Sequence, residues 1–137
     1  MNALVLDSEA LSRLARARQH EHPGLVLAAL QAAFETGAEV FVPAAVLAEQ
    51  YRGGRHDQVV DSCLGRHTGL QVADTTRALA RRVGNLLARA GRGSADHVDA
   101  TVVAVAAAVG GGLVVTGDPE DLGALADGLV GVTIEAL

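Results

Sequence analysis

The feature that most constrains the fold is a regular alternation of short apolar runs with longer segments of helical periodicity. The apolar runs occupy residues 4–6, 39–42, 69–73, 113–116 and 131–137. The helical segments between them begin at residue 8 and then cover about 25–36, 43–51, 57–66, 75–90, 94–109 and 118–126. This alternation is typical of a parallel sheet covered by helices on both faces, with right-handed crossovers. We therefore predict an α/β fold, a three-layer α/β/α sandwich forming a single domain over residues 1–137.

Local signals predict where several of these helices begin and end. Gly37 is a helix stop, and Pro43 suits the first turn of the following helix. Asp74 or Thr75 is expected to cap the helix that follows the third strand. Ser94 is available to cap the segment 94–109.

Composition indicates a folded protein of a reducing compartment. Half of the 137 residues are hydrophobic, so we do not expect the chain to be disordered. The single cysteine, Cys63, excludes an internal disulfide and a four-cysteine zinc site, and we predict it to be a core residue. The N-terminus lacks the basic region of a signal peptide, and the apolar run 100–115 is too short and too interrupted by glycine to span a bilayer. We expect a soluble, cytoplasmic protein.

Charge is distributed unevenly along the chain. All eleven basic residues are arginines and lie within residues 1–92, whereas residues 93–137 contain only acidic charges. A basic body beside an acidic C-terminal third could serve a polyanion held next to a metal site.

Acidic residues from four separate segments are expected to meet at one edge of the sheet. Asp7 directly follows the first strand, Asp118 follows the fourth, and Glu49 lies two turns into the helix after the second. Asp96 and Asp99 lie in the first turns of the helix that leads to the fourth strand. Ligands of open parallel sheets bind beyond the carboxyl ends of the strands. Like charges gathered there repel, and a divalent cation with oxygen ligands, Mg²⁺ or Mn²⁺, would relieve the repulsion.

Each acid also has a simpler interpretation. Asp7 could cap the first helix, Asp118 before Pro119 is a common turn and N-cap pair, and Glu49 could be solvated. Asp96 could merely favour the positive end of its helix. Taken together these separate explanations weaken, because they do not account for the gathering of uncompensated charge.

Four segments of the chain resemble the four conserved blocks of PIN domains, in the same order: LVLDSEAL, VLAEQY, DATVVAVAA and VVTGDPEDL. The closest likeness is to the VapC-type ribonuclease toxins of bacterial toxin–antitoxin pairs. The resemblance implies that the metal-binding acids are Asp7, Glu49, Asp99 and Asp118. It makes Thr116 an auxiliary hydroxyl residue, and Ser8 beside Asp7 is a second auxiliary candidate. Asp96 matches no invariant position of the family, and it is either an auxiliary ligand or part of the helix start.

The resemblance also implies an activity and partners. It implies a Mg²⁺- or Mn²⁺-dependent endoribonuclease that forms homodimers and is blocked by a small antitoxin. Asp7, Asp99 and Asp118 would hold one or two ions, and Glu49 would ligate through water or orient the attacking water. The run 110–112 is about one glycine longer than usual, so Asp121 is the alternative to Asp118.

Arginines are the candidates for holding RNA. On the first helix they are Arg13, Arg16 and Arg18, and later in the chain they lie within 77–92, with Arg77, Arg81 and Arg82 foremost. Such phosphate contacts give largely sequence-independent binding, and the alternative is a solvated helix face. With only three aromatic residues in the chain, base stacking is not a major source of specificity.

Three other interpretations remain to be weighed. A phosphoacceptor receiver domain also has an acidic magnesium pocket, but such domains use a lysine and this chain has none. The glycine-rich stretches 91–94 and 110–112 lack the lysine or the spacing of nucleotide-binding loops. A PIN-like RNA- or protein-binding module without activity keeps the fold, and only the complete set of acids argues against it.

Overall fold

The computed structural model describes residues 2–16 and 24–137, which form five strands and seven α-helices. The strands are β1 (Ala3–Leu6), β2 (Glu39–Pro43), β3 (Leu70–Ala73), β4 (Gly112–Thr116) and β5 (Val132–Ala136). The helices are α1 (Ser8–Ala15), α2 (Gly24–Thr36), α3 (Ala44–Gln50), α4 (Gly54–Arg66), α5 (Arg77–Ala90), α6 (His97–Ala108) and α7 (Pro119–Ala126). A 3₁₀ turn, η1 (Ser94–Asp96), directly precedes α6.

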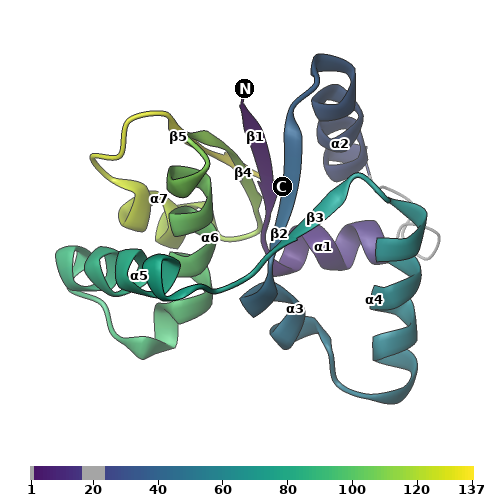
Figure 1. Cartoon of the computed structure of the whole chain (residues 1–137), viewed down its shortest axis with the longest axis horizontal. Helices are drawn as coiled ribbons and strands as arrows, with labels where there is room; N and C mark the ends of the chain where they lie inside the picture. Colours follow the sequence, from purple (N-terminus) through teal and green to yellow (C-terminus); the bar gives the residue numbers. More distant parts are fainter. Residues whose placement is uncertain (1, 17–23) are drawn as a thin grey trace.

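All five strands belong to one parallel sheet with the order β3-β2-β1-β4-β5. Helices α1, α2 and α4 lie on one side of the sheet, and α5, α6 and α7 lie on the other (Figure 1). The predicted three-layer α/β/α sandwich is confirmed. Receiver domains have the strand order 2-1-3-4-5, so the observed order excludes that alternative.

The core is built around the central strand β1 and helix α6. All four residues of β1 are buried, as is every residue from 100 to 106 of α6. Helix α6 is apolar around its whole circumference because it contacts strands on one side and α5 and α7 on the others. Cys63 is fully buried, which confirms its prediction as a core residue.

Three predicted helix ends need correction. The hydroxyl of Thr76, rather than Asp74 or Thr75, caps α5, because Thr76 is the last residue with extended backbone and accepts from the Leu79 N–H at 3.1 Å. Ser94 caps no helix, since the turn η1 already gives the Asp96 N–H a partner in the Gly93 carbonyl. Helix α4 begins at Gly54, three residues before the predicted start, and α1 ends at Ala15. The predicted extension of α1 to Arg18 enters a segment outside the described residues.

The carboxyl ends of β1 and β4 lie side by side at the centre of the sheet. Leu6 pairs with Val115, and the Asp7 N–H donates to the Val115 carbonyl at 3.4 Å. The chain proceeds from β1 towards β2 but from β4 towards β5, so its connections leave this point in opposite directions. Such a switch point is where open α/β sheets bind ligands.

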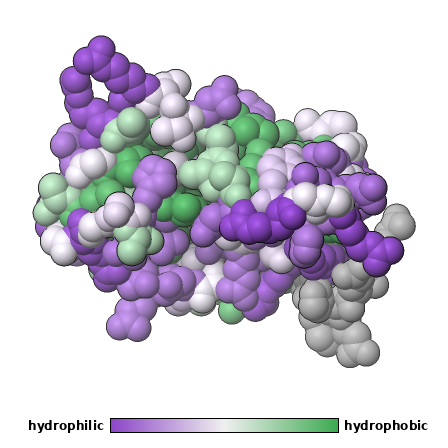
Figure 2. All heavy atoms as spheres, turned by 90° about the horizontal axis from the view of Figure 1, so that it is seen from below, coloured by the Kyte–Doolittle hydropathy of each residue, from purple (hydrophilic) through white to green (hydrophobic). Residues whose placement is uncertain are grey.

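Hydrophilic side chains cover most of the lower end of the molecule, towards which β1 runs, with hydrophobic groups visible between them (Figure 2). None of the helices within the described ranges has the length and apolar content needed to cross a bilayer.

Candidate metal centre

Asp7 is held at the switch point by hydrogen bonds to both of its carboxylate oxygens. Its Oδ1 accepts from the Ala10 N–H at 2.8 Å and so caps α1, while its Oδ2 accepts from the Gly117 N–H at 3.2 Å. The side chain is only 6% exposed. Burial raises the pKa of Asp7, and the hydrogen bonds from Thr116, Ala10 and Gly117 oppose that rise. The cap expected from the sequence is present, and each oxygen retains capacity for a further partner.

Thr116 connects Asp7 to the segment that follows β4. The fully buried hydroxyl donates to the Asp7 carboxylate and accepts from the Asp118 N–H at 2.8 Å. Asp118 in turn caps α7, because its Oδ1 accepts from the Asp121 N–H at 3.3 Å. Its carboxylate lies at the surface, facing solvent at the rim of the sheet.

Glu49 reaches the same region from α3. The Ser8 hydroxyl donates to its Oε1, and the Gln50 side-chain amide donates to the Ser8 carbonyl at 3.1 Å. Ser8 therefore ties the first turn of α1 to the last turn of α3. This pair of contacts fixes where the exposed Glu49 carboxylate can lie.

Asp99 stands among the other acids. Its half-buried carboxyl lies in the first turn of α6. Burial, together with the surrounding negative charge, raises the pKa of Asp99 from 3.8 to about 6. The carboxylates that add to the rise are those of Asp118, Asp7, Asp121 and Glu49, in decreasing order. Acids from three other parts of the sequence thus act on the carboxyl group of Asp99.

The tightest group of carboxylates among the described residues is formed by Asp96, Asp99 and Asp121. One oxygen from each lies within 4.8 Å of the others. Asp96 and Asp99 come from the start of α6, and Asp121 comes from the first turn of α7, which packs against α6. The sequence predicts Asp121 as a ligand only as the alternative to Asp118. In the structure both carboxylates lie near enough to Asp99 to raise its pKa.

Arg92 is the charged residue at this site that sequence reasoning did not single out. Its Nη1 lies 2.8 Å from Asp121 Oδ1 and 3.7 Å from Asp96 Oδ1. The hydrogen bond from Arg92 lowers the pKa of Asp121. Sequence placed Arg92 only within the basic range 77–92, and no local signal pairs it with acids on two other elements.

The oxygen-only donor set fits a hard divalent cation. Carboxylates are the preferred protein ligands of Mg²⁺ and Mn²⁺, which need few of them and keep several waters. Burial first, and then the neighbouring carboxylates, raise the pKa of Asp99 and so disfavour its charged form. A bound cation would stabilise the ionised form of this carboxyl group.

The arginines proposed for RNA differ in their surroundings. Arg13 pairs with Glu9 at 2.8 Å on the exposed face of α1. Arg16 donates to the Ser12 hydroxyl at 2.8 Å and lines a hollow of about 290 Å³ together with Arg55 and Arg66. No acid is found among the described residues that line this hollow.

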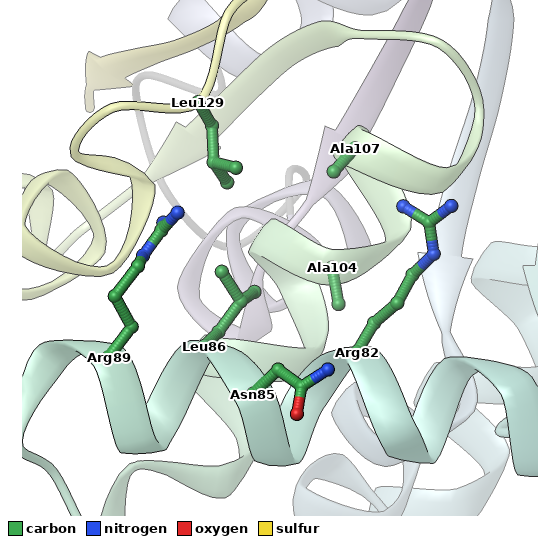
Figure 3. A pocket seen from close by; sticks show the side chains of 7 residues that line it. All are labelled: Arg82, Asn85, Leu86, Arg89, Ala104, Ala107 and Leu129. Carbon is green, nitrogen blue, oxygen red and sulfur yellow. The ribbon is translucent and has the colours of Figure 1, made fainter.

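Helix α5 carries the remaining candidates. Arg77 and Arg81 line a shallow depression at its start. Arg82 and Arg89 flank a separate hollow of about 200 Å³ between α5, α6 and Leu129, and Leu86 points into it between the two guanidinium groups (Figure 3). Apart from the Arg89 contact to a backbone carbonyl, these side chains present their charge to solvent.

A parallel three-layer sandwich with carboxylates gathered at the ends of its central strands defines an α/β protein with an acidic edge site. The chain belongs to the PIN domain family, whose pattern it matches over residues 4–127. No curated protein matches it at the level of the whole sequence.

Solved structures with the same fold include two VapBC structures. The chain is similar to one in VapBC2 from Rickettsia felis bound to a DNA fragment from their promoter, with 16% identity, a TM-score of 0.66 and 98% of each chain covered. It is also similar to one in DNA-bound VapBC from Salmonella typhimurium, with 20% identity, a TM-score of 0.63, and 99% of this chain and 98% of the other covered. At these identities the likeness shows the fold.

Proposed function

We propose that the chain is a Mg²⁺- or Mn²⁺-dependent endoribonuclease and the toxin of a toxin–antitoxin pair. The observation that carries this proposal is geometric: carboxylates converge at one edge of the sheet, where one oxygen each of Asp96, Asp99 and Asp121 lie within 4.8 Å of one another and the Gly117 N–H joins Asp7 to the segment after β4. A structural cap or a solvated surface acid requires no such convergence. A phosphodiesterase that depends on metal ions does require it.

Each acid has a distinct proposed role. Asp7, Asp99 and Asp118 hold the metal, and Asp96 is an auxiliary residue beside them. Glu49 ligates through water or orients the attacking water, and the Ser8 hydroxyl positions it. Thr116 positions Asp7 and the backbone of Asp118. The metal, when bound, activates water and neutralises charge on the phosphate and the leaving oxygen.

Arginines outside the acidic edge supply the attraction for RNA. The metal-free edge is negative and would repel a polyanion, so affinity must come from other surfaces. The arginine-lined hollow between α1 and α4 and the exposed arginines of α5 provide it. Such contacts act on phosphates, so binding should weaken steeply as salt rises.

A small antitoxin is the proposed protein partner, and a homodimer is the proposed assembly. The structural neighbours in VapBC complexes support the partner. Helix α2 exposes the large apolar side chains Leu25, Leu27 and Phe34, each more than 40% exposed, as a helix covered by another protein would. Toxin and antitoxin would both act in the cytoplasm, where the RNA substrate is found.

The test is RNA cleavage by purified protein with Mg²⁺, with Mn²⁺ and with chelator. Asp7→Asn is the informative variant, because asparagine retains an oxygen for the Ala10 N–H and removes the charge. Asp74→Asn, in the exposed loop before α5, is the matched control. We expect cleavage by the parent and the control only with metal, and none by Asp7→Asn. Equal cleavage by Asp7→Asn would refute the metal assignment, and metal-independent RNA binding without cleavage would favour the inactive module.

A further inference from the structure

Arg92 is fixed at the acidic edge by the backbone as well as by its side chain. Gly91, in left-handed conformation with φ 65°, ends α5, and the Arg92 N–H donates to the Leu87 carbonyl at 2.8 Å. These two features form a Schellman-type C-cap, which sets the direction in which Arg92 leaves the helix. Its side chain is 26% exposed, and among the described arginines only Arg16 and Arg92 are partly buried.

The Arg92 guanidinium already occupies part of the tightest carboxylate group. Of the three acids whose oxygens lie within 4.8 Å of one another, Asp121 is bonded to Arg92 at 2.8 Å and Asp96 lies 3.7 Å from it. Within the described ranges, no other arginine forms an ion pair with an acid of this edge. Arg92 therefore supplies a positive charge where a cation would otherwise be held.

A divalent ion placed among Asp96, Asp99 and Asp121 would lie close to the Arg92 guanidinium, because both would contact the carboxylates of Asp96 and Asp121. Two cations at that range repel, and the ion would have to displace a charge-assisted hydrogen bond to gain its ligand. Asp7 and Asp118 differ from these acids. They accept hydrogen bonds from backbone N–H groups and, for Asp7, from the Thr116 hydroxyl, and neither forms an ion pair with an arginine in the described structure.

We infer that Arg92 serves as the second cation of the site: its guanidinium fills the Asp96–Asp99–Asp121 position, so that the protein holds a single divalent ion, bound by Asp7, Asp99 and Asp118. The inference rests on the proposed function, since it presupposes that the acidic edge binds metal. Arg92 is thus a positioning residue, because it acts through the carboxylates that it neutralises. It sets the number of metal ions and leaves Asp99 for the one that is bound.

The number of bound ions tests the inference without reference to activity. Mn²⁺ binding to the full chain is counted by electron paramagnetic resonance and calorimetry at pH 7.5. We expect one ion per chain in the parent and two in Arg92→Gln, because removal of the guanidinium frees the second position. The double variant Arg92→Gln with Asp121→Asn should return to one ion, and Arg92→Lys, which keeps the charge, should also bind one.

Arg13→Gln is the matched control for the loss of a charge. Arg13 also forms a 2.8 Å pair with an acid four residues away, outside the three-acid group, so this variant should still bind one ion. Arg92→Met keeps the aliphatic part of the side chain and replaces Arg92→Gln if that variant does not fold, as judged by circular dichroism.

The possible counts separate this inference from the proposed function. One ion in both the parent and Arg92→Gln would overturn the role of Arg92 and leave the metal centre standing, and two ions in the parent would do the same. No bound ion in the parent would overturn the metal centre itself, and the inference with it. A second ion that persists after Asp121→Asn would place the new site elsewhere and would also refute the inference.

Discussion

Replacing Asp99 with asparagine is expected to stabilise the metal-free protein at neutral pH. The pKa of Asp99 rises from 3.8 to about 6 in the folded state. At about 1.4 kcal/mol for each pH unit, the charged form is disfavoured by at most about 3 kcal/mol. Because the carboxyl is only half-buried, solvent screening reduces this to about 1–2 kcal/mol. The variant also loses the interaction of a negative charge with the helix start, about 0.5 kcal/mol.

The net gain of about 1 kcal/mol should raise Tm by about 3–5 °C in a chain of this size. Its dependence on pH follows from the raised pKa. Between pH 3.8 and about 6 the folded protein binds a proton at Asp99 more tightly than the unfolded chain does. Parent stability therefore falls as pH rises through this range, so the advantage of Asp99→Asn should be small below pH 4 and complete above pH 6.

Thermal unfolding followed by circular dichroism in the presence of chelator, at pH 4 and pH 7.5, measures this effect. The control Asp74→Asn should melt within about 1 °C of the parent at both values, as exposed substitutions usually do. With Mn²⁺ added, the order should reverse, because the parent gains binding energy that the variant lacks. If Asp99→Asn has a Tm at or below that of the parent at pH 7.5 without metal, the negative charge of Asp99 does not destabilise the folded protein, and the reasoning is refuted.

Two further substitutions test how the edge and the sheet are built. Thr116→Val keeps the shape of a fully buried side chain but leaves the Asp118 N–H without its acceptor and Asp7 without a donor. Urea denaturation should show that the free energy of unfolding falls by about 1–3 kcal/mol. An unchanged midpoint would refute this hydrogen-bond assignment. Gly112→Ala places a methyl group 2.6 Å from the Ala3 carbonyl oxygen in the central strand, so it should cost at least about 1–3 kcal/mol. Gly65→Ala, which meets no atom within 4 Å in α4, should instead stabilise by about 0.5–1 kcal/mol; equal effects would contradict the packing described for β4.

The alternation of apolar runs with helical periodicity was sufficient to predict the fold. Each run is short, and a strand buried on both faces must be apolar throughout, as β1 is. Once the sheet is parallel, the carboxyl ends of its strands share one edge. The rule predicted that Asp7 would approach the segment after β4, and the hydrogen bond from the Gly117 N–H joins them.

The detailed contacts of the acidic edge could not be predicted from the sequence, because they depend on how the helix ends pack. Asp96 meets Asp121 only because η1 turns the chain before α6 and because α7 starts against it. Whether Thr76 or Thr75 caps α5 depends on one pair of backbone angles. Arg92 lies in a basic stretch typical of a solvated surface, and only the left-handed Gly91 directs it towards the acids.

The hydrogen bond between Asp7 and Gly117 spans 110 residues of sequence, and this has a consequence for synthesis. The strand that carries Asp7 is made long before its neighbour β4, which begins at Gly112. The acidic edge is therefore absent from every nascent chain that has not reached the start of α7. The proposed nuclease activity would therefore begin only after α7 has been made and has packed against α6.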